Sequence, residues 1–199
     1  MFNQFLWFVA RGSGIVSLLM VTASVCFGLL TVARFWHETW PRFFNLEMHR
    51  RISLLAIVFN VVHITSAVLD PFVKLGWSAA FVPLVSAYRP VPVALGVISM
   101  YLFIALVITG LLRAHMPQGL WRAIHWSSYA MWPLALAHSF LSGSDAGSLW
   151  MLAIGGVSLG AVGACLLFRI SVWDAGRGRL EDAVLTSSWE DATRRTKSR

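Results

Sequence analysis

Two stretches of this sequence decide its fold, and each of them carries two histidines. They are residues 49–69, HRRISLLAIVFNVVHITSAVL, and residues 121–141, WRAIHWSSYAMWPLALAHSFL. A helix of about 20 mostly apolar residues covers the roughly 30 Å hydrocarbon core of a lipid bilayer. Both stretches therefore predict membrane-spanning helices.

Three further apolar runs have a similar length, and they cover residues 12–33, 91–112 and 149–170. The chain of 199 residues is 57% hydrophobic and 13% charged, with a mean hydropathy of +0.68. An average soluble domain carries about 25% charged residues. We therefore expect an all-α membrane helix bundle with about five transmembrane helices.

The runs divide the chain into three parts. We expect an outer N-terminal segment over residues 1–11, a transmembrane domain over 12–172 and a cytoplasmic polar tail over 173–199. The tail has mixed charges and few large apolar residues, which is typical of a disordered or surface-lying segment. The connection over residues 70–90 is too apolar for a solvated loop, so we expect it to fold back over the bundle as a cap.

The basic residues predict the orientation of the bundle. Of the 16 lysines and arginines, 13 fall in the connections after the first and third runs and in the C-terminal end. Cytoplasmic connections are enriched in these residues. We therefore expect the N-terminus outside and the C-terminus in the cytoplasm, and the net charge of +7 reflects topology rather than nucleic-acid binding.

Two classes of chemistry are disfavoured by the composition. The cysteines Cys26 and Cys165 both sit in apolar runs, and the pair provides neither a disulfide framework nor a cysteine-ligated zinc or iron–sulfur site. The nine acidic residues all lie outside the apolar runs. Catalysis by paired carboxylates therefore has no obvious site.

The histidine spacing is the strongest functional signal in the sequence. His49 and His63 are 14 residues apart, and His125 and His138 are 13 apart, which corresponds to about 20 Å along each helix axis. Both runs cross in the same direction in a five-helix bundle, so His49 matches His125 in depth and His63 matches His138. Facing imidazoles at one depth can hold a haem iron from both sides, and two levels would hold two haems.

One spacing raises a geometric difficulty. Fourteen residues return a straight helix to nearly the same face, whereas 13 residues miss it by roughly 140°. Pro133 lies between His125 and His138, and a proline kink or a local change of winding would alter the direction of the second ligand. His37 and His115 have no matched partners, and we interpret both as surface residues.

At these residues the chain resembles a known family. The segments LEMHRRISLLAIVFNVVHITSAVLD (46–70), FVPLVSAYRP (81–90) and LWRAIHWSSYAMWPLALAHSF (120–140) are similar to the ferric reductase-like transmembrane domain. That domain is shared by NADPH oxidases, ferric reductases and the haem subunit of bacterial periplasmic methionine sulfoxide reductase. The resemblance covers roughly residues 12–170 and includes the paired histidine spacing.

The resemblance implies a cytochrome with two haem b groups that moves electrons across a bacterial cytoplasmic membrane. His49 and His125 would bind the inner haem iron, and His63 and His138 the outer one. Large members of the family carry a C-terminal flavin and nicotinamide domain, whereas about 29 residues follow the last apolar run here, without a Gly-rich dinucleotide fingerprint. We therefore expect the electron-transfer subunit of an oxidoreductase.

Such a subunit needs separate redox partners. A cytoplasmic flavoprotein reductase or a quinol would be the donor, and an extracytoplasmic flavoprotein or ferric iron would be the acceptor. Candidate partners for the haem propionates are Arg50, Arg51 and Arg122 inside and Arg89 outside, since a guanidinium matches a carboxylate in two hydrogen bonds. For any single inner arginine, topology signalling is the better account.

Two other functions remain open for membrane histidines. They serve in transporters or channels, where they bind metal ions or relay protons, and a haem can be structural in a membrane anchor that assembles other subunits. The lack of a carboxylate in the apolar runs and the wide separation of the two histidines on each helix disfavour the transporter.

Overall fold

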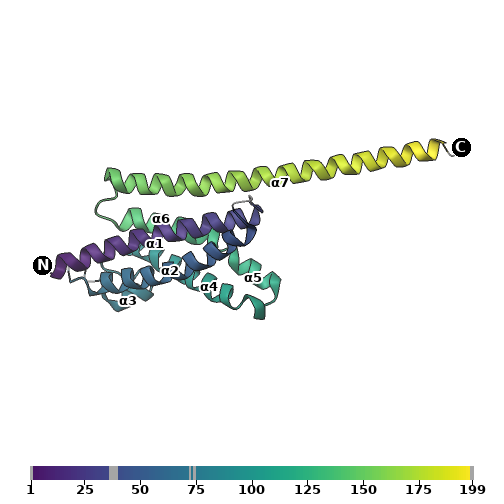
Figure 1. Cartoon of the computed structure of the whole chain (residues 1–199). Helices are drawn as coiled ribbons and strands as arrows, with labels where there is room; N and C mark the ends of the chain where they lie inside the picture. Colours follow the sequence, from purple (N-terminus) through teal and green to yellow (C-terminus); the bar gives the residue numbers. More distant parts are fainter. Residues whose placement is uncertain (1, 36–39, 72, 74, 198–199) are drawn as a thin grey trace.

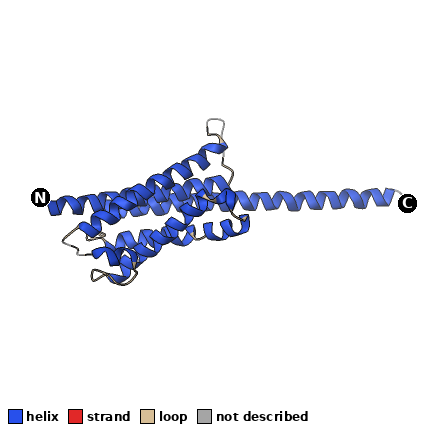
Figure 2. Cartoon of the chain, turned by 90° about the horizontal axis from the view of Figure 1, so that it is seen from below, coloured by secondary structure: helices blue, strands red, loops and turns tan. Residues whose placement is uncertain are grey.

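The computed structural model of this protein is an all-α bundle (Figures 1 and 2). It describes the backbone of residues 2–35, 40–71, 73 and 75–197, with side chains described as far as residue 175, except at 2, 3 and 42. The elements, in chain order, are α1 (Phe2–Val32), α2 (Arg42–Leu69), α3 (Gly76–Phe81), α4 (Pro90–Leu111), the 3-10 turn η1 (Arg113–His115), α5 (Gln118–His125), α6 (Ser128–Ser142) and α7 (Leu149–Lys197).

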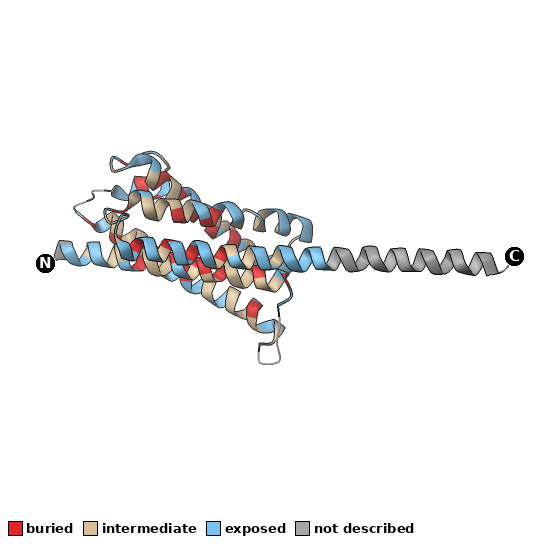
Figure 3. Cartoon of the chain, turned by 90° about the horizontal axis from the view of Figure 1, so that it is seen from above, coloured by how far each residue is buried: buried red, intermediate tan, exposed pale blue. Residues whose placement is uncertain are grey.

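Four helices in the described part of the chain are long and apolar enough to cross a membrane. These segments are Gln4–Val32, Phe43–Leu69, Pro90–Leu111 and Leu149–Ala175. Buried residues gather where the helices face one another, and exposed residues cover the outside (Figure 3). Many of the exposed residues are large and apolar, as lipid-facing residues are. The all-α class is confirmed, and by length and composition these four helices are those of a multi-pass membrane protein.

The fourth predicted run, residues 121–141, is not one continuous helix. Its residues are divided between α5, of 8 residues, and α6, of 15 residues. At 1.5 Å per residue, α6 measures about 22 Å, which is short for a hydrocarbon core of roughly 30 Å. The structure therefore has four membrane-length helices and a broken fifth segment.

The break also bears on the spacing of 13 residues. The N–H groups of Ser127, Tyr129 and Ala130 each donate to the carbonyl three residues earlier. A turn of this kind has 3.0 residues rather than 3.6, so each residue adds about 20° of rotation. The extra winding reduces the mismatch between His125 and His138. It lies at the α5–α6 junction, whereas Pro133, where we predicted a kink, is inside α6.

Both ends of the chain are helical over the described residues. Helix α1 begins at Phe2 and continues without a break through the first predicted run. Helix α7 continues to Lys197 and extends past the other helices (Figure 1), and a disordered or surface-lying tail was the expectation for residues 173–199. No proline interrupts residues 149–197, and proline is the residue that most strongly ends a helix.

The helices pack in two neighbouring pairs, α1 against α2 and α4 against α6, with α7 against α1. One apolar core joins them, and its buried residues are Leu18, Val21, Leu29, Ala56, Phe103, Leu106, Met131, Trp132, Leu136 and Val162. Within this core, the Trp132 indole N–H donates to Thr22 Oγ1 at 2.9 Å, which ties α6 to α1. The contact between α1 and α6 thus joins the two helix pairs into one bundle.

The apolar connection between α2 and α4 folds over one end of the bundle, as expected for a cap. It contains α3, in which Ala79 and Ala80 are buried. Tyr101 on α4 donates its hydroxyl to the carbonyl of Phe81. This cap lies at the same end of the bundle as the N-terminus (Figure 1).

An ion pair and a hydrogen bond join α1 to the α6–α7 connection at this end of the bundle. Arg11 on α1 forms an ion pair with Asp145 in the α6–α7 connection, and its Nε donates to Asp145 Oδ2 at 3.1 Å. Both side chains are about four-fifths buried, with 21% and 22% of their surface exposed. A charge that is partly removed from water depends strongly on its counter-charge.

We expect Asp145→Ala to lower the thermal midpoint of the detergent-solubilised protein, because it leaves Arg11 without a counter-charge. The loss should exceed the 0.2–1 kcal/mol or so typical of an exposed ion pair. Glu47→Ala is the matched control, since Glu47 pairs with Arg51 on the exposed face of α2. Equal shifts in the two variants would contradict the structural role of the Arg11–Asp145 pair.

Candidate functional site: two levels of paired histidines

The structure brings the four spaced histidines together in the two predicted pairs. The ring centroids of His49 and His125 are 6.1 Å apart, and those of His63 and His138 are 6.3 Å apart. Two metal–nitrogen bonds of about 2 Å each, together with the two ring radii, account for a separation of this size. Each pair is thus spaced to hold one metal atom between its imidazoles.

Three of the four rings are oriented by a backbone carbonyl. The Nδ1 atom of His63 lies 2.7 Å from the carbonyl oxygen of Ala10, and that of His138 lies 2.8 Å from that of Pro92. His49 Nδ1 lies 2.8 Å from the oxygen of Ser24. Because a carbonyl can only accept, Nδ1 carries the proton at each of these rings, and Nε2 is the nitrogen with a free lone pair.

Glycines on the neighbouring helices make this approach possible. A Cβ atom at Gly14 would lie 2.7 Å from the His63 ring, and one at Gly96 would lie 2.6 Å from the His138 ring. A Cβ at Gly28 would stand 3.4 Å from His49. At Gly14 and Gly96 only glycine lets the backbone come so close to a ring, whereas the distance at Gly28 is at the edge of ordinary contact. Gly14 and Gly28 repeat on α1 the 14-residue spacing of His49 and His63 on α2, a signal that the sequence reasoning missed.

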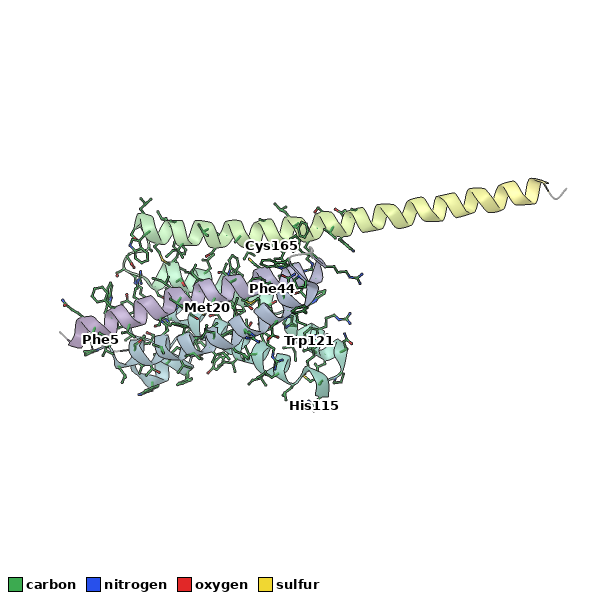
Figure 4. All side chains as sticks on the ribbon, in the orientation of Figure 1. Phe5, Met20, Phe44, His115, Trp121 and Cys165 are labelled. Carbon is green, nitrogen blue, oxygen red and sulfur yellow. The ribbon has the colours of Figure 1, made fainter. Side chains whose placement is uncertain are left out.

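His125 is held in a different way. Its ring stacks on that of Trp121, with centroids 4.8 Å apart and planes inclined by 22°. The Arg113 guanidinium lies over the Trp121 ring, 4.3 Å from its centroid. His125 Nδ1 and Trp121 Nε1 are buried, and neither has a hydrogen-bond partner among the described residues. Figure 4 shows Trp121 at the same end of the bundle as His115.

A cavity of about 260 Å³ adjoins the pair His63–His138. Its walls are mostly apolar, and its polar lining includes Arg11, Asp70 and Tyr88. The residues of the α3 cap, Ala79 and Ala80, close one side. Small molecules and cofactors bind in cavities of this kind, apolar with a few polar groups.

The four predicted arginines differ in their surroundings. Arg50 and Arg122 are exposed, and Arg51 pairs with Glu47. Arg89 adopts a left-handed conformation at the N-cap of α4, and its Nη1 donates to the carbonyl of Leu141 at 2.7 Å. It thereby satisfies a carbonyl at the end of α6, the helix that carries His138.

The two cysteines and the two remaining histidines are not members of the histidine pairs. Cys26 on α1 and Cys165 on α7 are free thiols that interact with each other, which the sequence did not indicate. Cys165 is labelled on α7 in Figure 4. His115 is exposed, as expected of a surface residue, and His37 lies outside the described residues.

Comparisons with known proteins add no assignment: no family model, curated protein or solved structure matches the chain. The geometry of the histidine pairs therefore carries the functional argument.

We expect Gly96→Val to displace the His138 imidazole and to abolish binding of any metal or haem at the His63–His138 pair. The physical reason is the 2.6 Å approach, which a side chain cannot share. Absorption spectra and metal content of the purified variant would measure the loss. Gly110→Val is the control on the same helix, since a Cβ there meets no atom within 4 Å. Full binding in the Gly96 variant would contradict the close-approach argument.

Proposed function

We propose that this protein is a transmembrane b-type cytochrome that transfers electrons across a membrane through two bis-histidine haems. The observation that carries the proposal is the repetition of one arrangement at two depths: facing imidazoles 6.1 and 6.3 Å apart, on α2 and on the α5–α6 segment. Two imidazoles at each of two levels are the ligand set of two six-coordinate haems. Haem, when bound, supplies one-electron chemistry at iron.

The residues of the chain fit this group. The Nδ1–carbonyl hydrogen bonds at His49, His63 and His138 fix the tautomer needed for ligation, in which Nε2 keeps its lone pair. Gly14, Gly28 and Gly96 keep the helix backbones close to these rings. The apolar cavity beside His63 and His138 offers the low-polarity walls that favour burial of a porphyrin.

The competing transporter or channel is less well supported. A metal ion bound only by protein usually needs three or four ligands, and the described residues contain no group of three or more histidine, cysteine or carboxylate side chains that could hold one. Two imidazoles at one level suit a metal whose other ligands come from a macrocycle. A reduced-minus-oxidised spectrum of the purified protein separates the two functions.

The charge distribution supports an orientation of the bundle. The short helix α5, which carries Arg122, lies toward the end from which α7 extends, and His115 and Trp121 are labelled there, whereas the α3 cap lies at the opposite end (Figures 1 and 4). We propose that the arginine-rich end faces the cytoplasm of a bacterial cell, so that His49–His125 is the inner level. Electrons enter there from a separate flavoprotein or a quinol, and leave at the His63–His138 level to an extracytoplasmic flavoprotein or ferric iron.

The role proposed for arginines in binding haem propionates stays a prediction. Arg50, Arg51 and Arg122 belong to the inner end of the proposed bundle, and Arg89 to the outer end. For Arg89 the contacts with Leu141 and Gly143 support a second role, since they hold the end of α6 beside His138. Arg11 is a further candidate for binding a haem propionate, because it lines the cavity beside His63.

We expect two haems b per chain, because the ligand arrangement occurs twice. Pyridine haemochrome analysis against protein concentration measures the ratio. A ratio near zero would remove the proposed function, whereas a ratio of one would remove one level. His115→Ala is the control substitution, because His115 is exposed and has no facing imidazole among the described residues.

His63→Ala or His138→Ala should remove the outer haem and leave a single redox transition from the inner one. Each level draws its ligands from its own pair, so the second pair survives the loss of the first. Potentiometric titration of each variant counts the transitions. Two unchanged transitions in either variant would show that the depth pairing is wrong.

The ring orientations predict a spectroscopic signature. The imidazole planes are inclined by 72° at the inner pair and by 79° at the outer pair. If the imidazoles held haem iron with their planes inclined in this way, the iron orbitals would be close in energy, so we expect strongly anisotropic low-spin ferric EPR signals from the haem-loaded protein. Ordinary rhombic signals, typical of parallel imidazole planes, would contradict the observed ring geometry.

A further inference from the structure

The two histidine levels are not equivalent in their surroundings. At the outer level both rings have a backbone carbonyl at Nδ1, from Ala10 and Pro92. At the inner level only His49 has one, from Ser24, and the Nδ1 atom of His125 has no hydrogen-bond partner among the described residues. His125 is also the last residue of the short helix α5, whereas the other three histidines lie inside longer helices.

A stack of side chains replaces the missing hydrogen bond. Trp121 lies one helical turn before His125 on α5, the spacing at which side chains share a face. Its ring lies nearly parallel to the imidazole, and Arg113 from η1 lies against the same indole. Trp121 is partly buried, whereas Trp126, the residue that follows His125, is 67% exposed. The stack fixes the His125 ring by contact with a flat surface.

Resting on the proposed function, we propose that Trp121 is the positioning residue of His125, and that the Arg113–Trp121 stack makes the inner iron the more easily reduced of the two. The aromatic surface of Trp121 sets the plane of the His125 imidazole, and the Arg113 cation over the same indole biases the charge at the ligand.

The electronic part follows from hydrogen bonding. An Nδ1–H group that donates to a carbonyl gives its imidazole more anionic character and makes it a more basic ligand, which favours ferric iron. The outer level has two such bonds and the inner level one. The inner imidazoles are therefore weaker electron donors to a bound iron. Reduction of iron at the inner level is easier for that reason.

The nearby cations act in the same direction. Arg113 interacts electrostatically with His125, and no acidic side chain pairs with it in the described ion pairs. Arg11 stands near the outer level, but its charge is offset by Asp145. A positive charge near a redox centre favours the state with the extra electron. The inner iron thus gains stabilisation of its reduced form that the outer iron lacks.

The test compares four variants of the full-length, haem-loaded protein. Trp121→Leu removes the aromatic surface, Trp121→Phe keeps a ring, Arg113→Gln removes the cation, and Trp126→Leu is the control on the exposed neighbour. Each is examined by EPR and by potentiometric titration, with His63→Ala used to assign the inner signal. These readouts report the plane and charge of the ligand, which a loss of packing elsewhere would leave unchanged.

We expect Trp121→Leu to shift the inner EPR signal or to release the inner haem, while Trp121→Phe and Trp126→Leu retain both. Arg113→Gln should lower the midpoint potential of the inner haem by roughly 59 mV. This shift corresponds to a change of about tenfold in the equilibrium constant for electron transfer between the two haems. The outer transition should stay in place throughout.

Two results would overturn this inference and leave the proposed cytochrome intact. One is an inner midpoint at or below the outer one in the unsubstituted protein with two haems. The other is an inner EPR signal in Trp121→Leu that equals that of Trp126→Leu. By contrast, an unsubstituted protein without haem would overturn the proposed function itself.

Discussion

Close contact between histidine rings and the backbone of adjacent helices is the constraint on which the rest of this structure depends. The Nδ1 atoms of His49, His63 and His138 each reach a carbonyl oxygen on a neighbouring helix. Carbonyl groups inside a helix normally accept hydrogen bonds from N–H groups of the same helix. A histidine on a neighbouring helix can reach such a carbonyl only if the backbones of the two helices lie unusually close. Glycines at Gly14 and Gly96 make that possible. The pairing of α1 with α2 and of α4 with α6 follows from this requirement.

The α5–α6 segment departs from this pattern, and its departure has a consequence for the proposed electron path. Because the segment is broken after His125, that ring is held by stacking on Trp121. An inner site that is more easily reduced would retain an electron against outward transfer. In a membrane with a negative interior, however, the field favours outward movement of an electron by about 2.3 kcal/mol per 100 mV over the full membrane. The proposed asymmetry is therefore compatible with outward flow driven partly by the membrane potential.

Several features could be predicted from the sequence, because they depend on length, hydropathy and period. Apolar runs of about 20 residues locate α1, α2, α4 and α7, and the spacing of His49 and His63 indicates their separation along one helix face. Other features could not be predicted. The tight winding that follows His125 depends on local hydrogen bonds, and periodicity does not report it. The role of Gly14 was missed because its importance arises only from the ring that lies against it.

The sequence by itself determined an all-α membrane protein with histidines at two matched depths, because bilayer thickness fixes helix length and 1.5 Å of rise per residue converts spacing into depth. Only the tertiary structure decided which rings face each other, which carbonyl orients each ring, and that Arg11 pairs with Asp145 rather than standing alone. These contacts join residues that are up to 134 positions apart. They depend on how helices pack against one another, and that packing is set by the whole bundle rather than by any one stretch.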